Sequence, residues 1–183
     1  MARKKRTNPI FAGILICLVM IGCTPKAKSL DSASKESLKN QADTFISDWH
    51  IAASEANYEN YFGKMDSLSI FIGTDYTENW DKAEFEAFSK PYFDKGTAWS
   101  FSALDRNIYM NDSGEILWFD ELLKTWMGIC RGSGVLENKN GTLTLKHYVL
   151  SVTVPNEKVS GFLELKPQEI DSTFLKNLRI TKR

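Results

Sequence analysis

The sequence is poor in cysteine and histidine, and its charges cancel. Its three cysteines are too few for a disulfide scaffold or a four-thiolate metal site. The two histidines, His50 and His147, lie far apart in the sequence, and a catalytic zinc commonly takes three protein ligands, so we expect no metal site. Basic and acidic residues each number 23, a balance that argues against a nucleic-acid-binding protein. No phosphate-binding loop, nucleophile elbow or dinucleotide-binding motif is present, and we expect no cofactor.

A long hydrophobic run is also lacking, which bears on the N-terminus. After the basic cluster at residues 3–6, the apolar run Ile10–Ile21 is shorter than the roughly 20 residues that a membrane-spanning helix needs. A basic segment followed by a short apolar one is typical of a secretory signal peptide. The run ends in Met20-Ile21-Gly22-Cys23, which resembles a bacterial lipobox. That resemblance implies removal of residues 1–22 and lipidation of Cys23.

The expected product is a lipoprotein of the bacterial cell envelope, anchored to a membrane on its periplasmic or surface side. Two acyl chains on Cys23 would anchor it stably. The Ser- and Lys-rich residues 23–37 predict a flexible tether, followed by a domain over 38–157 and a C-terminal extension over 158–183. An ordinary signal peptide with a chance cysteine, or an uncleaved signal anchor, are the alternatives.

Helices are predicted in the first part of the domain. Apolar residues at three- and four-residue spacing predict an amphipathic helix over residues 37–54, and a short helix follows over Tyr58–Phe62. Residues 68–72 have the composition of a strand. Asp81 and Glu84 form a capping box that opens a further helix, which Gly96 ends and which Pro91 is expected to kink or shorten.

After Gly96 the period of the pattern changes from 3.6 residues to two. Strands are predicted from Trp99 onward and over residues 116–125, 128–137 and 142–154, with Asn140-Gly141 as a hairpin turn. Helices followed by an antiparallel meander indicate an α+β fold. In the extension, Phe162–Leu165 is expected to add a short strand before a final amphipathic helix.

Several segments, in the order and spacing of these elements, resemble one family. They are Asp48-Trp49-His50, Phe71-Ile72-Gly73-Thr74-Asp75, Trp80, Lys90-Pro91-Tyr92-Phe93, Trp118-Phe119-Asp120-Glu121, Gly132-Ser133-Gly134-Val135-Leu136 and His147-Tyr148-Val149-Leu150-Ser151. Over residues 38–157 the chain is similar to the SnoaL-like branch of the nuclear transport factor 2-like superfamily. The resemblance implies a cone-shaped α+β fold in which N-terminal helices pack on a curved antiparallel sheet around an open pocket. The family includes isomerases, cyclases and dehydratases, and also members without known activity, so the fold alone does not assign an enzyme.

Alternation of side chains predicts which residues of the last strand face the pocket. Leu143 and Leu145 need a core, so His147 and Ser151, on the same face by alternation, are expected to point into the cone. Related sequences often have a second histidine where this chain has Val149, which weighs against chemistry through a histidine pair.

The same alternation places Asp120 of the 116–125 strand beside the pocket, with Trp118, and turns Glu121 outward. Arg131 is assigned to the pocket less firmly, because neighbouring glycines permit a bulge. Asp120 beside His147 is a candidate general base, since desolvation raises a carboxyl pKa. Alternatively, Asp120 and Arg131 form an ion pair that orients an anion, or these residues are only structural.

Aromatic residues are the most suggestive feature, because small-ligand pockets are generally lined by such side chains with a few polar groups. Most aromatics at these spacings belong to a core. The predicted ligand-binding set is Trp49, Tyr61, Trp80, Tyr92, Trp99, Trp118, Asp120, Arg131, His147 and Ser151. The loop with Asp75, Tyr76 and Glu78 is either part of the pocket rim or a solvated loop.

Three functions are compatible with these features. The first is a membrane-tethered lipoprotein that binds a small, partly apolar ligand in the cone. The second is an acid–base enzyme, an isomerase, dehydratase or hydrolase, that uses Asp120 or His147. The third is a homodimeric interaction module whose contact is the sheet face that carries Phe119, Glu121, Lys146 and Tyr148.

Overall fold

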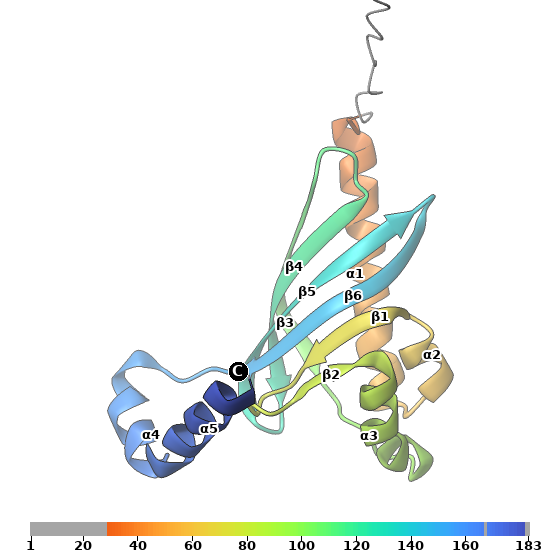
Figure 1. Ribbon diagram of the computed structural model, residues 1–183. Coiled ribbons are helices and arrows are strands. Elements are labelled where there is room, and N and C mark those ends of the chain that lie inside the picture. Colours follow the sequence, from red (N-terminus) through yellow and green to blue (C-terminus); the bar gives the residue numbers. More distant parts are fainter. Residues whose placement is uncertain (1–28, 167, 182–183) are drawn as a thin grey trace, which may run out of the picture.

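The computed structural model describes residues 29–166 and 168–181, so the predicted signal peptide and Cys23 lie outside the described residues. Helices pack against a curved, open sheet of six strands (Figure 1), and the predicted α+β class is confirmed. Within the described part of the chain, no helix is long and apolar enough to cross a membrane.

Helix α1 (Ser32–Ser54) begins where the side chain of Asp31 accepts a 2.8 Å hydrogen bond from the backbone N–H of Ser34. Because this N-cap starts the helix early, residues 32–37 belong to α1 rather than to the predicted tether. The inner face of α1 follows the predicted spacing, with buried side chains at Leu38, Ala42, Ile46, Trp49 and Ala53.

Helix α2 (Tyr58–Phe62) coincides with its prediction, and strand β1 (Met65–Ile72) contains the predicted one. A short strand that the sequence pattern did not predict, β2 (Asn79–Asp81), pairs with β1 in the antiparallel sense. It precedes helix α3 (Lys82–Asp94) without a loop.

The capping box at the start of α3 is confirmed. The Asp81 carboxylate accepts a 2.9 Å bond from the Glu84 N–H, and the Glu84 carboxylate accepts a 3.1 Å bond from the Asp81 N–H. Pro91 lies inside α3, which continues to Asp94, although the proline removes one backbone donor. The chain leaves the helix at Gly96, whose φ of +71° suits glycine.

The four long strands are β3 (Ser102–Met110), β4 (Ile116–Thr125), β5 (Gly128–Lys139) and β6 (Thr142–Val152). The sheet has the order β2-β1-β6-β5-β4-β3, with β1 parallel to β6 and the other neighbouring pairs antiparallel. The predicted meander is therefore confirmed. Trp99 and Phe101 precede β3 instead of lying in it. Asn140 and Gly141 turn the hairpin with φ values of 54° and 87°, as a two-residue turn requires.

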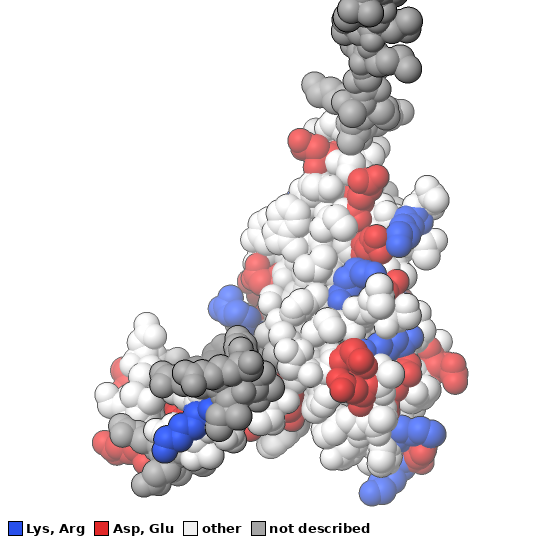
Figure 2. Space-filling view, in the orientation of Figure 1, with Lys and Arg blue, Asp and Glu red and all other residues white. Residues whose placement is uncertain are grey.

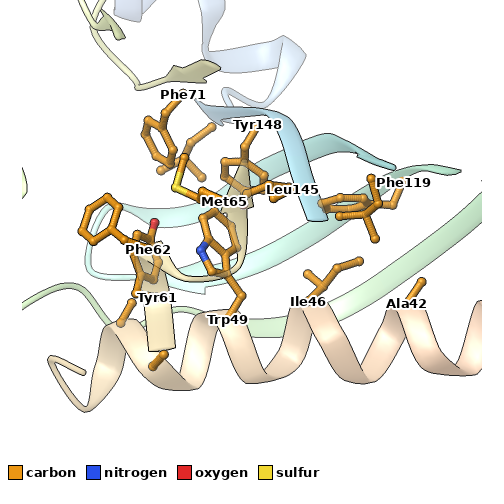
Figure 3. Packing of buried hydrophobic residues seen from close by; sticks show 14 of the residues in the cluster. Ala42, Ile46, Trp49, Tyr61, Phe62, Met65, Phe71, Phe119, Leu145 and Tyr148 are labelled. Atoms are coloured by element: carbon orange, nitrogen blue, oxygen red, sulfur yellow. The ribbon is translucent and has the colours of Figure 1, made fainter. Parts of the chain in front are cut away.

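The core lies between α1 and the concave face of the sheet (Figure 3). Trp49 of α1 is its centre: its ring stacks on Tyr61 at 4.8 Å and meets the edge of Tyr148 from β6, also at 4.8 Å. The opposite face of the sheet, which we call the outer face, is turned away from α1. Figure 2 shows this face as a largely uncharged surface between charged margins.

After β6 the chain forms a 3-10 turn, Asn156–Lys158, and helices α4 (Val159–Leu165) and α5 (Gln168–Thr181), which lie beside the cone (Figure 1). The strand predicted at Phe162–Leu165 is wrong, because these residues form the last turn of α4. A short apolar run does not by itself distinguish helix from strand. The predicted final helix is confirmed, and Phe174 on α5 packs against Tyr76 at 4.3 Å between ring centroids.

Candidate functional site

A cavity of about 150 Å³ opens at the end of the cone formed by β1, β2 and α3. We call it the aromatic cavity, because most of its lining is aromatic or aliphatic. The residues that line it are Phe71, Gly73, Thr74, Glu78, Trp80, Phe85, Phe88, Trp99, Phe101, Trp126, Met127 and Leu150. They come from β1, the loop after it, β2, α3, the segment before β3, the β4–β5 turn and β6.

Phe85 of α3 organises one wall of the aromatic cavity. Its ring stacks on Phe71 at 3.9 Å and on Trp80 and Trp99 at 5.6 and 5.7 Å. Trp80 also stacks on Phe88 at 4.5 Å. Offset stacking of this kind adds to the stabilisation that burial alone gives, so the wall is held by its own packing.

The rim of the aromatic cavity is the loop between β1 and β2. The Gly73 N–H donates to the Glu78 backbone carbonyl at 2.9 Å, and the Asp75 N–H donates to Oε2 of Glu78 at 3.1 Å. A Cβ atom at Gly73 would overlap the Glu78 carboxylate, so glycine is what lets that carboxylate lie over the loop. Hydrogen bonds from the hydroxyl and N–H of Thr77 hold the pKa of Asp75 below its usual value. The loop is thus closed by its own hydrogen bonds.

A second group of polar side chains is buried between α1 and the sheet. We call it the buried polar cluster: His50, Arg106, Glu121 and Tyr148. Oε1 of Glu121 accepts hydrogen bonds from Nε2 of His50 at 2.8 Å and from the Tyr148 hydroxyl at 3.0 Å. Oε2 of Glu121 accepts from Nε of Arg106 at 2.9 Å. Gly132 makes room for them, since a Cβ there would overlap the Tyr148 hydroxyl and Glu121.

The cluster keeps Glu121 ionised although only 1% of the residue is exposed. Burial raises the pKa of the Glu121 carboxyl, but the hydrogen bond and charge of His50, with the Arg106 guanidinium, outweigh burial and lower that pKa. Because a carboxylate only accepts, Nε2 of His50 carries the proton of their shared bond. Burial and the charge of Glu121 raise the pKa of Tyr148 well above its usual value, so its hydroxyl remains a donor.

The buried polar cluster does not reach the aromatic cavity. None of its four residues lines that cavity. Phe101 packs against His50 at 6.1 Å, and Phe71 packs against Tyr148 at 5.6 Å, so these two rings of the cavity wall lie beside the cluster. Arg106 also bonds the Asp43 carboxylate at 2.8 Å and the Ser47 hydroxyl at 2.9 Å, which attaches β3 to α1. In this structure the buried polar cluster has a structural role, because it holds α1 to the sheet.

The predicted direction of the β6 side chains is wrong. Leu136 pairs with Leu145 but Val135 pairs with His147, so a bulge interrupts the alternation at this point. Leu145 faces the core as expected, and after the bulge Tyr148 does so too. His147 and Ser151 therefore lie on the outer face.

The predicted orientation of the β4 side chains is also wrong. Leu117, Phe119, Glu121 and Leu123 are its buried residues, so Asp120 and Trp118 lie on the outer face and Glu121 inside. Arg131 is exposed and pairs with Ser151 on the neighbouring strand. The same facts place Phe119, Glu121 and Tyr148 in the core, so they cannot form the sheet face predicted for a dimer.

Of the aromatic residues predicted for the pocket, Trp80 and Trp99 line the aromatic cavity. Trp49 and Tyr61 are core residues, with 2% and 0% exposed, and Tyr92 is a half-exposed residue of α3 beside Phe88. Sequence reasoning missed Trp126, which is 84% exposed in the β4–β5 turn. A tryptophan in a tight turn, where no core needs it, was the available signal.

No three His, Cys, Asp or Glu side chains of residues 29–166 and 168–181 gather as metal ligands would. The one described free cysteine, Cys130, is buried in β5.

Comparison with known proteins identifies the domain. Residues 42–155 match the family model of the SnoaL-like domain. Among solved structures, a nuclear transport factor 2-like protein of unknown function from Pseudomonas putida is 12% identical, with a TM-score of 0.55 over 69% of this chain and 92% of that one. A domain of unknown function with a cystatin-like fold from Nostoc punctiforme is also 12% identical, with a TM-score of 0.55 over 84% and 100%.

A nuclear transport factor 2-like protein from Cytophaga hutchinsonii is again 12% identical, with a TM-score of 0.54 over 63% of this chain and 98% of that one. At such low identity these likenesses concern the fold alone. No curated protein matches the sequence.

Proposed function

Because the chain belongs to the SnoaL-like domain family, we propose that it is a ligand-binding protein whose site is the aromatic cavity. The observation that carries this proposal is a preformed, largely aromatic cavity with Glu78 and Thr74 at its rim. Small-molecule sites are typically concave and apolar, with a few polar groups that orient the ligand.

The volume of the aromatic cavity limits the size of the ligand. Drug-sized sites occupy about 300–1,000 Å³, whereas the aromatic cavity has about 150 Å³. An apolar cavity of about that volume accommodates one benzene molecule. We therefore expect a ligand, or the buried part of one, of roughly the size of a single six-membered ring.

The test is a titration of a small-molecule library against the purified full-length chain, followed by tryptophan fluorescence, since three tryptophans line the cavity. Thr74→Trp places bulk at the rim and should abolish binding. Thr142→Trp, at the exposed start of β6, is the matched control and should bind as the native chain does. Equal binding by both variants would place the ligand elsewhere and refute the proposal.

We further propose that lipid on Cys23 holds this domain to a membrane outside the cytoplasm. The lipobox-like Met20-Ile21-Gly22-Cys23 after a short apolar run supports this proposal. Intact-mass measurement of the membrane fraction should find a chain that begins at Cys23 and carries acyl chains. Cys23→Ser should remain unprocessed. A native chain that keeps residues 1–22, or begins at 23 without lipid, would contradict the proposal.

An acid–base enzyme is the second candidate, and the His50–Glu121 pair inside the cone favours it. Asp120 and His147 stand on the outer face, and neither lines the aromatic cavity. The position of Phe71 and Phe101 between the cluster and the aromatic cavity makes binding the better-supported function. Turnover of an identified ligand, lost in a Glu121→Gln variant that circular dichroism shows to be folded but kept in Asp120→Asn, would decide for the enzyme.

A homodimeric module is the third candidate, through the outer face rather than the face predicted from the sequence. Large apolar residues are exposed there, among them Tyr109 and Trp118, which stack at 6.1 Å, and Ile129. Apolar patches on a surface are typical of protein–protein contacts. This contact and the aromatic cavity do not share residues, so the two functions are compatible.

A further inference from the structure

We propose that the ligand of the aromatic cavity is a small organic cation, an amine or a quaternary ammonium ion, and this inference rests on the proposed ligand-binding function. The cavity combines ring surfaces with a single carboxylate, that of Glu78. None of the described residues that line it is Lys, Arg or His. The lining therefore offers a positive charge two kinds of attraction and no repulsion.

The rings supply the first attraction. A cation within about 6 Å of the face of an aromatic ring is attracted by the ring quadrupole, and tryptophan is the strongest partner. Trp80, Trp99 and Trp126 all line the cavity. Because the cavity has only about 150 Å³, a cation inside it lies close to several rings at once. Such contacts strengthen when the cation is desolvated, as it would be here.

Trp126 is the most informative of the three. Its side chain is 84% exposed in the β4–β5 turn, so folding gains little from the size of this residue. Its position at the open edge of the cavity gives it a ring that a bound cation would cover. The exposure of Trp126 is thus explained if the ring completes a cage.

Glu78 supplies the second attraction. Its Oε2 accepts one hydrogen bond from the Asp75 N–H at 3.1 Å, and its Oε1 has no hydrogen-bond partner among the described residues. Gly73 leaves the space that this carboxylate occupies. A half-buried carboxylate beside apolar rings is poorly solvated, and a cationic ligand would compensate that loss. An anion would be repelled, and a neutral ligand would leave the charge unpaired.

Free cations and the head groups of choline lipids share this chemistry. The place of the cavity favours the free ion: α1 begins at one end of the cone, whereas β2 and α3 lie at the other (Figure 1). A membrane anchor that precedes α1 would hold the opposite end of the domain. We therefore assign the site to a soluble cation.

The experiment compares choline with 3,3-dimethylbutan-1-ol, which has the same shape but carbon in place of the charged nitrogen. Calorimetric titration of the purified full-length chain should show choline bound at least about tenfold more tightly than the alcohol. Glu78→Gln keeps the shape of the side chain and should remove about tenfold of the choline affinity without changing that of the alcohol. Trp126→Leu should likewise weaken choline more than the alcohol. Glu59→Gln, an exposed charge change on α2, should alter neither.

The possible outcomes distinguish a failure of the cation inference from a failure of the proposed ligand-binding function. If the alcohol binds as tightly as choline, or if Glu78→Gln leaves the ratio of the two affinities unchanged, the inference of a cationic ligand is refuted. The proposed function, a site for an apolar ligand, then still stands. If neither compound binds a chain that circular dichroism shows to be folded, the cation inference fails, and the proposed ligand-binding function is then decided by the library titration with Thr74→Trp. Flotation with phosphatidylcholine vesicles distinguishes the free cation from the lipid head group. If the protein bound the vesicles but not choline, the assignment to a soluble ion would be overturned.

Discussion

Nε2 of His50 donates a 2.8 Å hydrogen bond to Oε1 of Glu121 and so joins α1 to β4 inside the core. Arg106 of β3 approaches the other oxygen of the same carboxylate and also bonds Asp43 of α1. One buried carboxylate thus connects the long helix to two neighbouring strands. Removal of one partner from such a group leaves a buried charge without compensation, which is strongly destabilising.

Replacing Glu121 by glutamine should lower the free energy of unfolding by about 3–5 kcal/mol, because the buried Arg106 would lose its buried counter-charge and keep only the half-exposed Asp43 carboxylate. Urea denaturation of the two proteins measures the difference. Asp120→Asn is the matched control: it removes one charge at the next residue but on the outer face, and should change stability by less than about 0.5 kcal/mol. If Glu121→Gln changed the stability no more than the control does, the structural role of the buried polar cluster would be contradicted.

The Glu121 carboxylate also predicts that the free energy of unfolding depends on pH. The pKa of Glu121 is lowered in the folded chain from its ordinary value of 4.5, so the unfolded chain takes up this proton first as the pH falls. The stability from Glu121 is complete above about pH 4.5 and is lost as the pH falls through the lower, folded pKa. Urea denaturation across this range should show a steeper loss of stability in the native chain than in Glu121→Gln. Parallel pH profiles would contradict the assignment.

Gly132 offers a test of the same packing without a change of charge. A methyl group in Gly132→Ala would overlap the Tyr148 hydroxyl and the Glu121 side chain, and overpacking of this kind costs about 1–3 kcal/mol. Gly161→Ala, in α4 with open space around the added carbon, should leave stability unchanged or raise it by up to about 1 kcal/mol. Thermal unfolding of both variants distinguishes them, and equal shifts would argue against the predicted clash.

The outer face predicts an oligomeric state. We expect a homodimer at micromolar concentration by multi-angle light scattering, because Trp118, the Tyr109 ring that stacks on it and Ile129 all expose apolar surface on the outer face. Trp118→Lys should give a monomer, since it would bury a charge in the contact. Ile51→Lys, a half-exposed residue on the far side of α1, should leave the dimer intact. A monomeric native chain, or a dimer that survives Trp118→Lys, would refute this contact.

Features that depend on neighbouring residues were predicted well. The capping box of Asp81 and Glu84, the helical spacing from Leu38 to Ala53 and the Asn140-Gly141 turn each act over a few residues. The exception is the start of α1, where the cap at Asp31 outweighs the polar composition that suggested a tether. The strand predicted at Phe162–Leu165 failed because so short a run carries no clear period.

The site was predicted less well, for a different reason. Both faces of β4 carry apolar residues and one carboxylate, so alternation alone did not decide between Asp120 and Glu121. The bulge after Leu145 then reversed the faces of β6, and no residue pattern marked it. Trp80 and Trp99 were identified as pocket candidates, whereas Trp126 was not, because its role depends on the β4–β5 turn coming close to β1 and α3.

The amino-acid sequence by itself determined the order of the main helices and strands from α1 to β6, without the short β2, together with the family and the expectation of an export signal, since each follows from local pattern or collinear motifs. Only the tertiary structure decided which carboxylate is buried and which residues form a cavity. Glu121 is stable inside because His50 and Arg106 reach it from other elements. Glu78 and the three tryptophans line one cavity because the fold brings the β1–β2 loop, the segment before β3 and the β4–β5 turn together. Such contacts join residues far apart in the chain, and their energy exists only once the elements are packed.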